Sequence, residues 1–178
     1  MDFLALVVRV IDVVNEMIGR VVMWLSLGVV LVCFATVYLR YALGTGKPWI
    51  QELYVWQHAI VFLAGAGYTL LHGGHVRVDL FYGRMSVTRR ALVDIFGTVV
   101  LLWPLSVVIA YESVPMIVMS WANDEVSQQP GGMADVWFLK AMLHVFCAVI
   151  FVQGIAVVAR GILVLGGRTE YAQQATAH

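Results

Sequence analysis

The chain has 178 residues, of which 61% are hydrophobic and only 12% are charged, and its mean hydropathy is +0.86. Because soluble domains carry about 25% charged residues, this composition excludes an ordinary water-soluble protein. Basic and acidic residues both number 11, a balance that gives no reason to expect a nucleic-acid partner. Cys33 and Cys147 both lie in apolar runs, so we expect neither a disulfide framework nor a cysteine-based metal site.

Residues 1–20 are predicted to form an amphipathic helix. Apolar residues recur at helical spacing along one face, and charged residues at i+3 and i+4 line the other: Phe3, Leu4, Val7, Ile11, Val14 and Ile18 against Arg9, Asp12, Glu16 and Arg20. The apolar face is expected either in the cytoplasmic headgroup layer or against a partner protein. No basic region precedes the apolar stretch and no cleavage site follows it, so Met1 is expected to be the mature start.

Four later stretches are long and apolar enough to span a bilayer, which takes roughly 20 residues. They cover about Val21–Leu43, Ile50–His72, Ala91–Met119 and Trp137–Leu165. Glycine- and proline-rich segments separate them, namely 44–48, 72–75 and 129–132. The prediction is an all-α membrane protein with a single membrane domain over residues 1–178, in which short connections favour antiparallel neighbours.

The distribution of positive charge predicts the orientation of the chain in the membrane. Eight of the 11 basic residues fall at the N-terminus, in the second loop and at the C-terminus, whereas Arg40, Lys47 and Lys140 fall on the other side. Both termini are therefore predicted to be cytoplasmic. Aromatic residues cluster near the predicted outer boundary, but Trp103 lies near the middle of the third span and is expected to pack between helices.

Ionisable residues within the predicted spans are the first candidates for function, because they are costly in a bilayer. Glu52 follows Pro48 within the first turn, where a carboxylate favours the positive end of the helix dipole, so capping or a partner contact is expected. Asp94 and Glu112 are 18 residues apart. In an unbroken α-helix this spacing places them on one face, about 27 Å apart at opposite membrane boundaries.

Two histidines suggest an alternative function. His58 and His144 lie at similar depths in the second and fourth spans, so they could hold a b-type haem between facing helices. Buried histidines that form interhelical hydrogen bonds are the more common case.

An H-x-x-H-x-x-x-D run ends the second span with His72, His75 and Asp79. Its spacing could hold a metal such as zinc, but Gly73 and Gly74 interrupt a helix there. A turn in which Arg77 and Asp79 are partners is the preferred reading. The chain contains no phosphate-binding loop, nucleophile elbow or metalloprotease motif, so it is not expected to be an enzyme.

A transporter acting alone is also poorly supported, because such proteins bind substrate near the midplane with broken helices or central charges. No acidic or basic residue falls at the predicted midplane. The residues themselves therefore favour a scaffold or accessory membrane subunit whose small residues allow close helix approach.

Several short motifs resemble the small membrane subunit of tripartite ATP-independent periplasmic (TRAP) transporters. They are Trp49-Ile50-Gln51-Glu52-Leu53, Gly65-Ala66-Gly67-Tyr68-Thr69-Leu70, His75-Val76-Arg77-Val78-Asp79, Ser120-Trp121, Glu125-x-Ser127, Gly131-Gly132, Lys140 and Gln153-Gly154. Each motif is short, but their order and spacing cover nearly the whole chain. One departure is Gln51, since many members have two successive acids there.

This resemblance implies a bacterial inner-membrane complex without a cofactor in this subunit. A periplasmic binding protein would deliver an organic acid to a large membrane subunit that moves it with sodium, and this chain would brace that subunit and help dock the binding protein. The His75–Asp79 motif is closest to the branch associated with 2-oxo acids and related monocarboxylates. Glu52 is expected to meet a cation of the large subunit, or Arg40 or Lys47 of this chain, so its removal should weaken assembly or transport.

The residues expected at partner interfaces or in structural contacts are Glu52, Trp56, His75, Arg77, Asp79, Asp94, Glu112, Glu125, Lys140 and Gln153. Two other hypotheses stay open. A haem-bearing electron-transfer subunit predicts a red preparation that depends on His58 and His144, and a free-standing protein that self-associates predicts stable homo-oligomers.

Overall fold

The structure, a computed structural model, describes residues 2–74, 85–168 and 170–173. All regular elements in these ranges are helices, which confirms the predicted all-α class. In chain order they are α1 (Asp2–Ala42), α2 (Pro48–Ala64), α3 (Ala66–Leu71), α5 (Val87–Phe96), the π-helix η1 (Gly97–Leu102), α6 (Trp103–Ala122), α7 (Val136–Leu165) and α8 (Glu170–Gln173).

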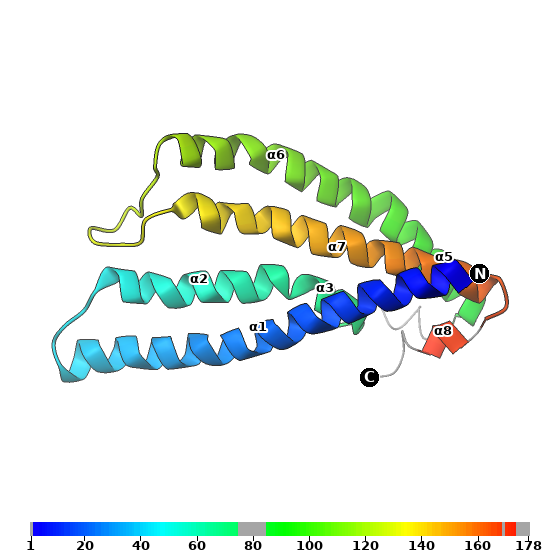
Figure 1. The fold of residues 1–178 in the computed structure, drawn as a ribbon, viewed down its shortest axis with the longest axis horizontal. Coiled ribbons are helices and arrows are strands. Elements are labelled where there is room, and N and C mark those ends of the chain that lie inside the picture. The colour runs from blue at the N-terminus through cyan, green and yellow to red at the C-terminus, as the bar shows by residue number, and fades with distance from the viewer. Residues whose placement is uncertain (1, 75–84, 169, 174–178) are drawn as a thin grey trace.

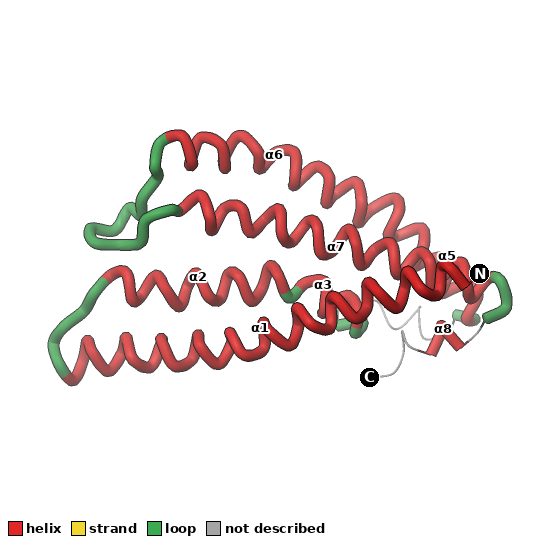
Figure 2. Tube along the Cα trace, in the orientation of Figure 1, coloured by secondary structure: helices red, strands yellow, loops and turns green. Residues whose placement is uncertain are grey.

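The long helices lie side by side, in the order α6, α7, α2 and α1 across the view of Figures 1 and 2. Helix α7 packs against α1, α2, α3, α5 and α6 and is the central element. Helix α6 lies at one edge and packs against α7. The N-terminal half of α1 crosses towards the C-terminal end of α7 (Figure 1), and Asp2 and Arg168 form an ion pair there.

Among the described residues, three continuous helical runs are long and apolar enough to cross a membrane: α1, the run Val87–Ala122 and α7. The predicted second span, Ile50–His72, corresponds to α2 and α3, which have 17 and 6 residues. Long apolar helices are thus confirmed for three of the four predicted spans, and the second span stays a prediction.

Helix α1 is continuous through the predicted boundary at residue 20. It contains 41 residues, because no proline or turn sequence separates the amphipathic segment from the first predicted span. Its buried residues Val8, Asn15 and Gly19 lie on the face that packs against α7 and α3 of the same chain. The N-terminal segment therefore contacts its own bundle along one face.

The interruption between α2 and α3 occurs at Gly65. The Gly65 N–H donates to the Val61 carbonyl at 3.0 Å, and the Gly65 carbonyl accepts both the Thr69 N–H at 3.0 Å and the Thr69 hydroxyl at 3.1 Å. A Cβ atom at residue 65 would lie 2.6 Å from the Val61 carbonyl oxygen. This tight turn therefore requires glycine.

A π-helical turn precedes Pro104 in the third predicted span. Proline lacks the N–H that an α-helix needs, and its ring crowds the carbonyl four residues earlier. The wider hydrogen-bonding pattern of η1 accommodates this change, and it offsets the following helix by about one residue, or about 100°. Asp94 and Glu112 therefore do not share the face expected for an unbroken α-helix.

Small residues bring α6 and α7 together. Ser106, Ser113 and Ser120 are buried at seven-residue spacing on α6, and Cys147 and Gly154 are buried at the same spacing on α7. Such residues allow close helix approach in membranes.

Trp103 packs across this α6–α7 interface, as predicted. Its indole N–H donates to the Phe151 carbonyl at 3.2 Å, and its ring stacks on Phe151 with centroids 5.1 Å apart. A Cβ atom at Gly154 would lie 2.6 Å from Trp103 Nε1.

Candidate functional site

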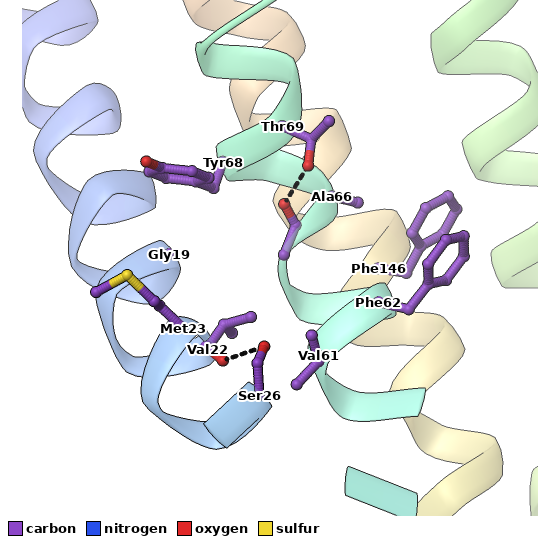
Figure 3. Close-up of a pocket in the computed structure, with 11 residues that line it drawn as sticks. Gly19, Val22, Met23, Ser26, Val61, Phe62, Ala66, Tyr68, Thr69 and Phe146 are labelled. Carbon is purple, nitrogen blue, oxygen red and sulfur yellow. Dashed lines mark hydrogen bonds between the residues drawn. The ribbon is translucent and has the colours of Figure 1, made fainter. Parts of the chain in front are cut away.

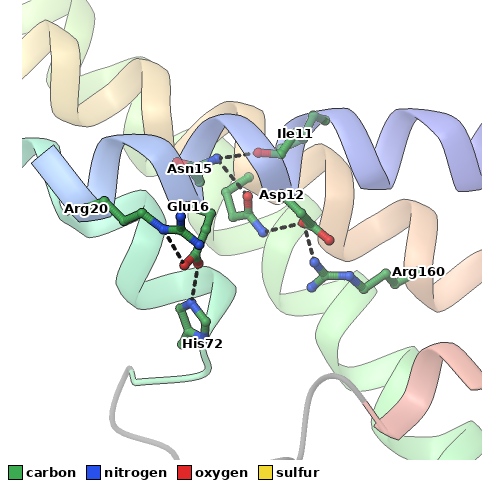
Figure 4. Close-up of polar contacts among 8 residues, drawn as sticks. Ile11, Asp12, Asn15, Glu16, Arg20, His72 and Arg160 are labelled. Carbon is green, nitrogen blue, oxygen red and sulfur yellow. Dashed lines mark hydrogen bonds and ion pairs between the residues drawn. The ribbon is translucent and has the colours of Figure 1, made fainter.

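A buried polar network joins α1 to α7 (Figure 4). Asp12 on α1 forms an ion pair with Arg160 on α7 and accepts a hydrogen bond from Gln153 Nε2 at 3.4 Å. The Arg160 side chain is only 9% exposed. Burying a charge is costly unless it is paired, so the Asp12–Arg160 pair fixes how α1 lies on α7.

Asn15 extends this network to a third helix. Its amide group donates to Gln153 Oε1 at 2.8 Å, and both side chains are almost fully buried, at 1% and 0% exposed. A Cβ atom at Gly67 would lie 2.2 Å from Asn15 Oδ1. The Asn15 amide is thus held between Gln153 of α7 and the backbone of α3.

Glu16 links α1 to the end of α3. It accepts a hydrogen bond from His72 Nε2 at 2.9 Å and pairs with Arg20 at 3.4 Å (Figure 4). The His72 ring also contacts the Tyr68 ring, with centroids 4.3 Å apart. His72 therefore has a structural role in the bundle.

A second polar cluster lies at the opposite end of the molecule and centres on Glu52. The Ser127 hydroxyl donates to Glu52 Oε1, and the Met133 N–H donates to Oε2 at 2.6 Å. A Cβ atom at Gly132 would lie 2.7 Å from Glu52 Oε1. Glu52 thus binds the α6–α7 loop to α2, and its observed partners belong to that loop and not to Arg40 or Lys47.

Glu125 and Lys140 form an ion pair across the base of the same loop. The hydrogen bond from Lys140 lowers the pKa of the Glu125 carboxyl. The backbone of Glu125 also accepts the Val136 N–H at 3.1 Å. The structure therefore brings together two residues that the sequence had singled out separately.

Aromatic side chains pack in pairs near this second cluster. Trp121 and Trp137 pack edge to face with centroids 4.4 Å apart, and Trp56 stacks on Phe138 at 6.3 Å. Trp56 thus joins α2 to α7 close to the Glu52 contacts.

His58 and His144 do not form the facing pair that the haem hypothesis needs. His58 is exposed on α2, whereas His144 is half-buried on α7, and no hydrogen bond joins them in the described parts of the chain. The electron-transfer alternative is not supported.

The remaining predicted residues lie outside these two clusters. Asp94 is half-buried on α5 and Glu112 is exposed on α6. His75, Arg77 and Asp79 lie outside the described residues. No group of metal-ligating side chains occurs within the ranges that the structure describes.

The contacts of Asp12, Asn15 and Arg160 were not predicted from the sequence. Arg160 lies inside a predicted span and is one of the eight basic residues that predict the cytoplasmic side. An arginine within an apolar helix needs a buried partner, and Asp12 and Asn15 on the polar face of α1 were the available candidates.

A protein-family model described as tripartite ATP-independent periplasmic transporters, DctQ component, matches residues 29–164 of the chain. Comparison with curated proteins and with solved structures gives no match. The matched range contains both Glu52 and Gln153 and covers most of the chain. The chain therefore belongs to the DctQ component family of the tripartite ATP-independent periplasmic transporters.

Proposed function

We propose that this chain is the small membrane subunit of a sodium-coupled, binding-protein-dependent TRAP transporter for organic acids, and that it braces the large transport subunit in the bacterial inner membrane. The family match over residues 29–164 is the observation that carries this proposal. The His75–Asp79 motif resembles that of the branch associated with 2-oxo acids and related monocarboxylates, so these compounds are the first substrates to test.

A four-span topology with both termini cytoplasmic is part of the proposal. Asp2 and Arg168 form an ion pair at 2.9 Å, so the two ends of the chain lie together. Adjacent ends require an even number of crossings, and the three long helices reach an even number when α2 and α3 form one further crossing. The basic residues concentrated at the two ends and in the second loop favour the cytoplasmic side.

The exposed face of α6 is the proposed contact with the large subunit. Helix α6 has no neighbour comparable to α7 among the other described long helices, and Leu105, Val108 and Tyr111 are exposed on it. Glu112 lies on the same surface, without an ion-pair partner among the described residues. Since a carboxylate facing lipid is costly, a cation of the large subunit would stabilise Glu112.

Purification in mild detergent from the native membrane tests the subunit assignment. We expect a colourless complex that contains a much larger multi-span protein, identified by mass spectrometry. A haem absorbance band without such a protein would overturn the assignment.

Replacing Glu112 tests the proposed interface. In Glu112→Gln, we expect recovery of the large subunit to fall several-fold while the thermal stability of the isolated chain is unchanged. Asp124→Asn is the matched control, because Asp124 is an exposed loop residue with a φ of 45°, which asparagine tolerates. Equal recovery of the large subunit with both variants would show that the interface does not depend on Glu112 of α6. The assignment of this chain as a subunit would not be affected.

A further inference from the structure

An apolar groove of about 480 Å³ lies between α1 and the α2–α3 break (Figure 3). Val22, Met23 and Ser26 line it from α1, Val61 and Phe62 from α2, and Phe146 from α7. Small residues also line the groove, namely Gly19 on α1, where the Tyr68 ring packs closely, and Gly65 and Ala66 at the junction of α2 and α3.

The groove opens sideways, in the direction that would face membrane lipid. Met23 is 62% exposed and Phe62 is 70% exposed, so both side chains border the opening. Met23 and Ser26 belong to a helix whose apolar length suits a membrane span. A water-filled apolar groove is unfavourable at this depth, so hydrocarbon is the occupant that the lining suits.

One end of the groove carries a polar cluster. Tyr68, which lines the groove, contacts His72, and His72 is hydrogen-bonded to Glu16 at 2.9 Å. Glu16 in turn pairs with Arg20, which directly follows the groove residue Gly19. The cluster therefore lies beside the end of the groove that is nearer to the chain termini.

Arg20 is available to bind an anion there. Its side chain is 73% exposed, and its contact with Glu16 uses Nε at 3.4 Å. A guanidinium group has five N–H donors and binds phosphate groups in a bidentate manner. Residue 20 also lies at the predicted start of the first span, which is where phospholipid phosphates lie.

We propose that this groove binds one phospholipid, with an acyl chain between α1 and α2 and the phosphate on Arg20. The apolar lining and the cation at one end match the two parts of such a molecule. The site belongs to this subunit and does not depend on the transported substrate.

Filling the groove tests the acyl-chain position. The complex is delipidated, reloaded with dipalmitoyl phosphatidylglycerol, and examined by native mass spectrometry for retained lipid. Ser26→Phe should fill the groove and reduce retention at least fivefold. The Ser26 hydroxyl donates to the Val22 carbonyl of its own helix, so its loss should not disturb the contact between helices. Ala35→Phe adds similar bulk at an exposed position of α1 and should leave retention unchanged.

Removing the guanidinium tests the phosphate position. Arg20→Gln should reduce phosphatidylglycerol retention several-fold, whereas Arg9→Gln, at another exposed position of α1, should not. Dipalmitoyl glycerol, which lacks phosphate, should bind weakly to the unaltered protein and equally weakly to Arg20→Gln.

Two results would overturn the proposal. One is equal retention in Ser26→Phe and Ala35→Phe, which would indicate lipid spread over the whole apolar surface. The other is retention in the isolated chain but not in the complex with the large subunit, which would show that protein fills the groove. A photoreactive acyl chain that labels peptides containing Met23 and Val61 in the intact complex would support it independently.

Discussion

Gly67 lies where three helices pack closely together. A Cβ atom there would lie 2.2 Å from Asn15 Oδ1 and 3.2 Å from Val149 Cβ. The Asn15 amide cannot move away without losing its hydrogen bond to Gln153. A single methyl group at residue 67 would therefore disturb both the buried amide pair and the approach of α3 to α7.

Gly67→Ala should lower the free energy of unfolding by about 1–3 kcal/mol, which is typical of overpacking. Thermal unfolding of the detergent-solubilised chain measures this effect. Gly28→Ala is the matched control, because the nearest atom to a Cβ at residue 28 is Gln57 Nε2 at 3.6 Å, an ordinary contact. Similar melting temperatures for the two variants would contradict the close approach at Gly67.

The Glu125–Lys140 pair predicts a dependence of stability on pH. Because Lys140 lowers the pKa of the Glu125 carboxyl below its ordinary value of 4.5, the folded state binds the proton less readily than the unfolded state. The pair therefore stabilises the fold above pH 4.5, and this contribution is lost as the pH falls through the lowered pKa. The effect is modest, because both side chains are partly exposed.

Lys140→Met should reduce the loss of thermal stability between pH 5 and pH 3. The measurement is the melting temperature of the unaltered protein and of Lys140→Met over this pH range. Glu125→Gln should behave like Lys140→Met, and an unchanged loss in both variants would assign the acid sensitivity to other carboxylates.

The sequence identified individual residues better than it identified their partners. Glu52 was singled out as an ionisable residue within a span, and Lys140 and Gln153 by the family resemblance, and all three make specific contacts in the structure. Their partners could not be predicted, because Ser127, Glu125 and Asn15 lie on other segments of the chain. Sequence spacing gives the face of one helix but not the neighbour that this face meets.

At the scale of elements, α1 is held on α7 by the Asp12–Arg160 pair. Removing one member of a buried ion pair leaves an uncompensated charge, at a cost of about 3–5 kcal/mol, whereas replacing both members by apolar groups can be nearly neutral. The Asp12→Ala and Arg160→Met variants should thus each be less stable than the double variant. Chemical unfolding of the three variants in mixed micelles measures the coupling.

The exposed Asp2–Arg168 pair provides the comparison for this double-mutant cycle. Asp2 is almost fully exposed, at 95%, so its coupling to Arg168 should be small. Equal coupling energies for the two pairs would show that the Asp12–Arg160 contact does not carry the docking of α1.

The helices were predicted more reliably than their irregularities. Apolar length identified the long helices because hydrophobic composition is a property of the segment itself. The π turn before Pro104 and the break at Gly65 depend on local hydrogen bonding, and proline and glycine each permit several outcomes. The expected shared face of Asp94 and Glu112 was lost for this reason.

For the whole molecule, the contact between the chain ends predicts the membrane topology. Tags at the N-terminus and C-terminus should be accessible only after the inner membrane is permeabilised. With Cys33 and Cys147 replaced by serine, new cysteines at Thr45 and Gln128 should react with an impermeant maleimide in intact spheroplasts. Labelling at only one of these loops would show that α2 and α3 do not form a crossing.

Sequence alone predicted an antiparallel set of helices but not their arrangement in a layer. Short loops make consecutive helices neighbours, which accounts for α1 with α2 and for α6 with α7. The position of α7 between the two pairs depends on its small and polar buried residues, including Ala156, Ala159 and Arg160. In the sequence these residues are indistinguishable from the rest of an apolar span, and only the contacts with α1 show their role.

The central position of α7 has a consequence for biosynthesis. Helix α7 follows the other long described helices in the chain, yet it supplies the partners of Asp12 and Asn15, which precede Gln153 by 141 and 138 residues. During co-translational insertion these two side chains stay unpaired or hydrated until α7 has been synthesised. Products that terminate before α7 would keep an unpaired aspartate in α1, and membrane proteases that survey unassembled helices could distinguish them from the finished subunit.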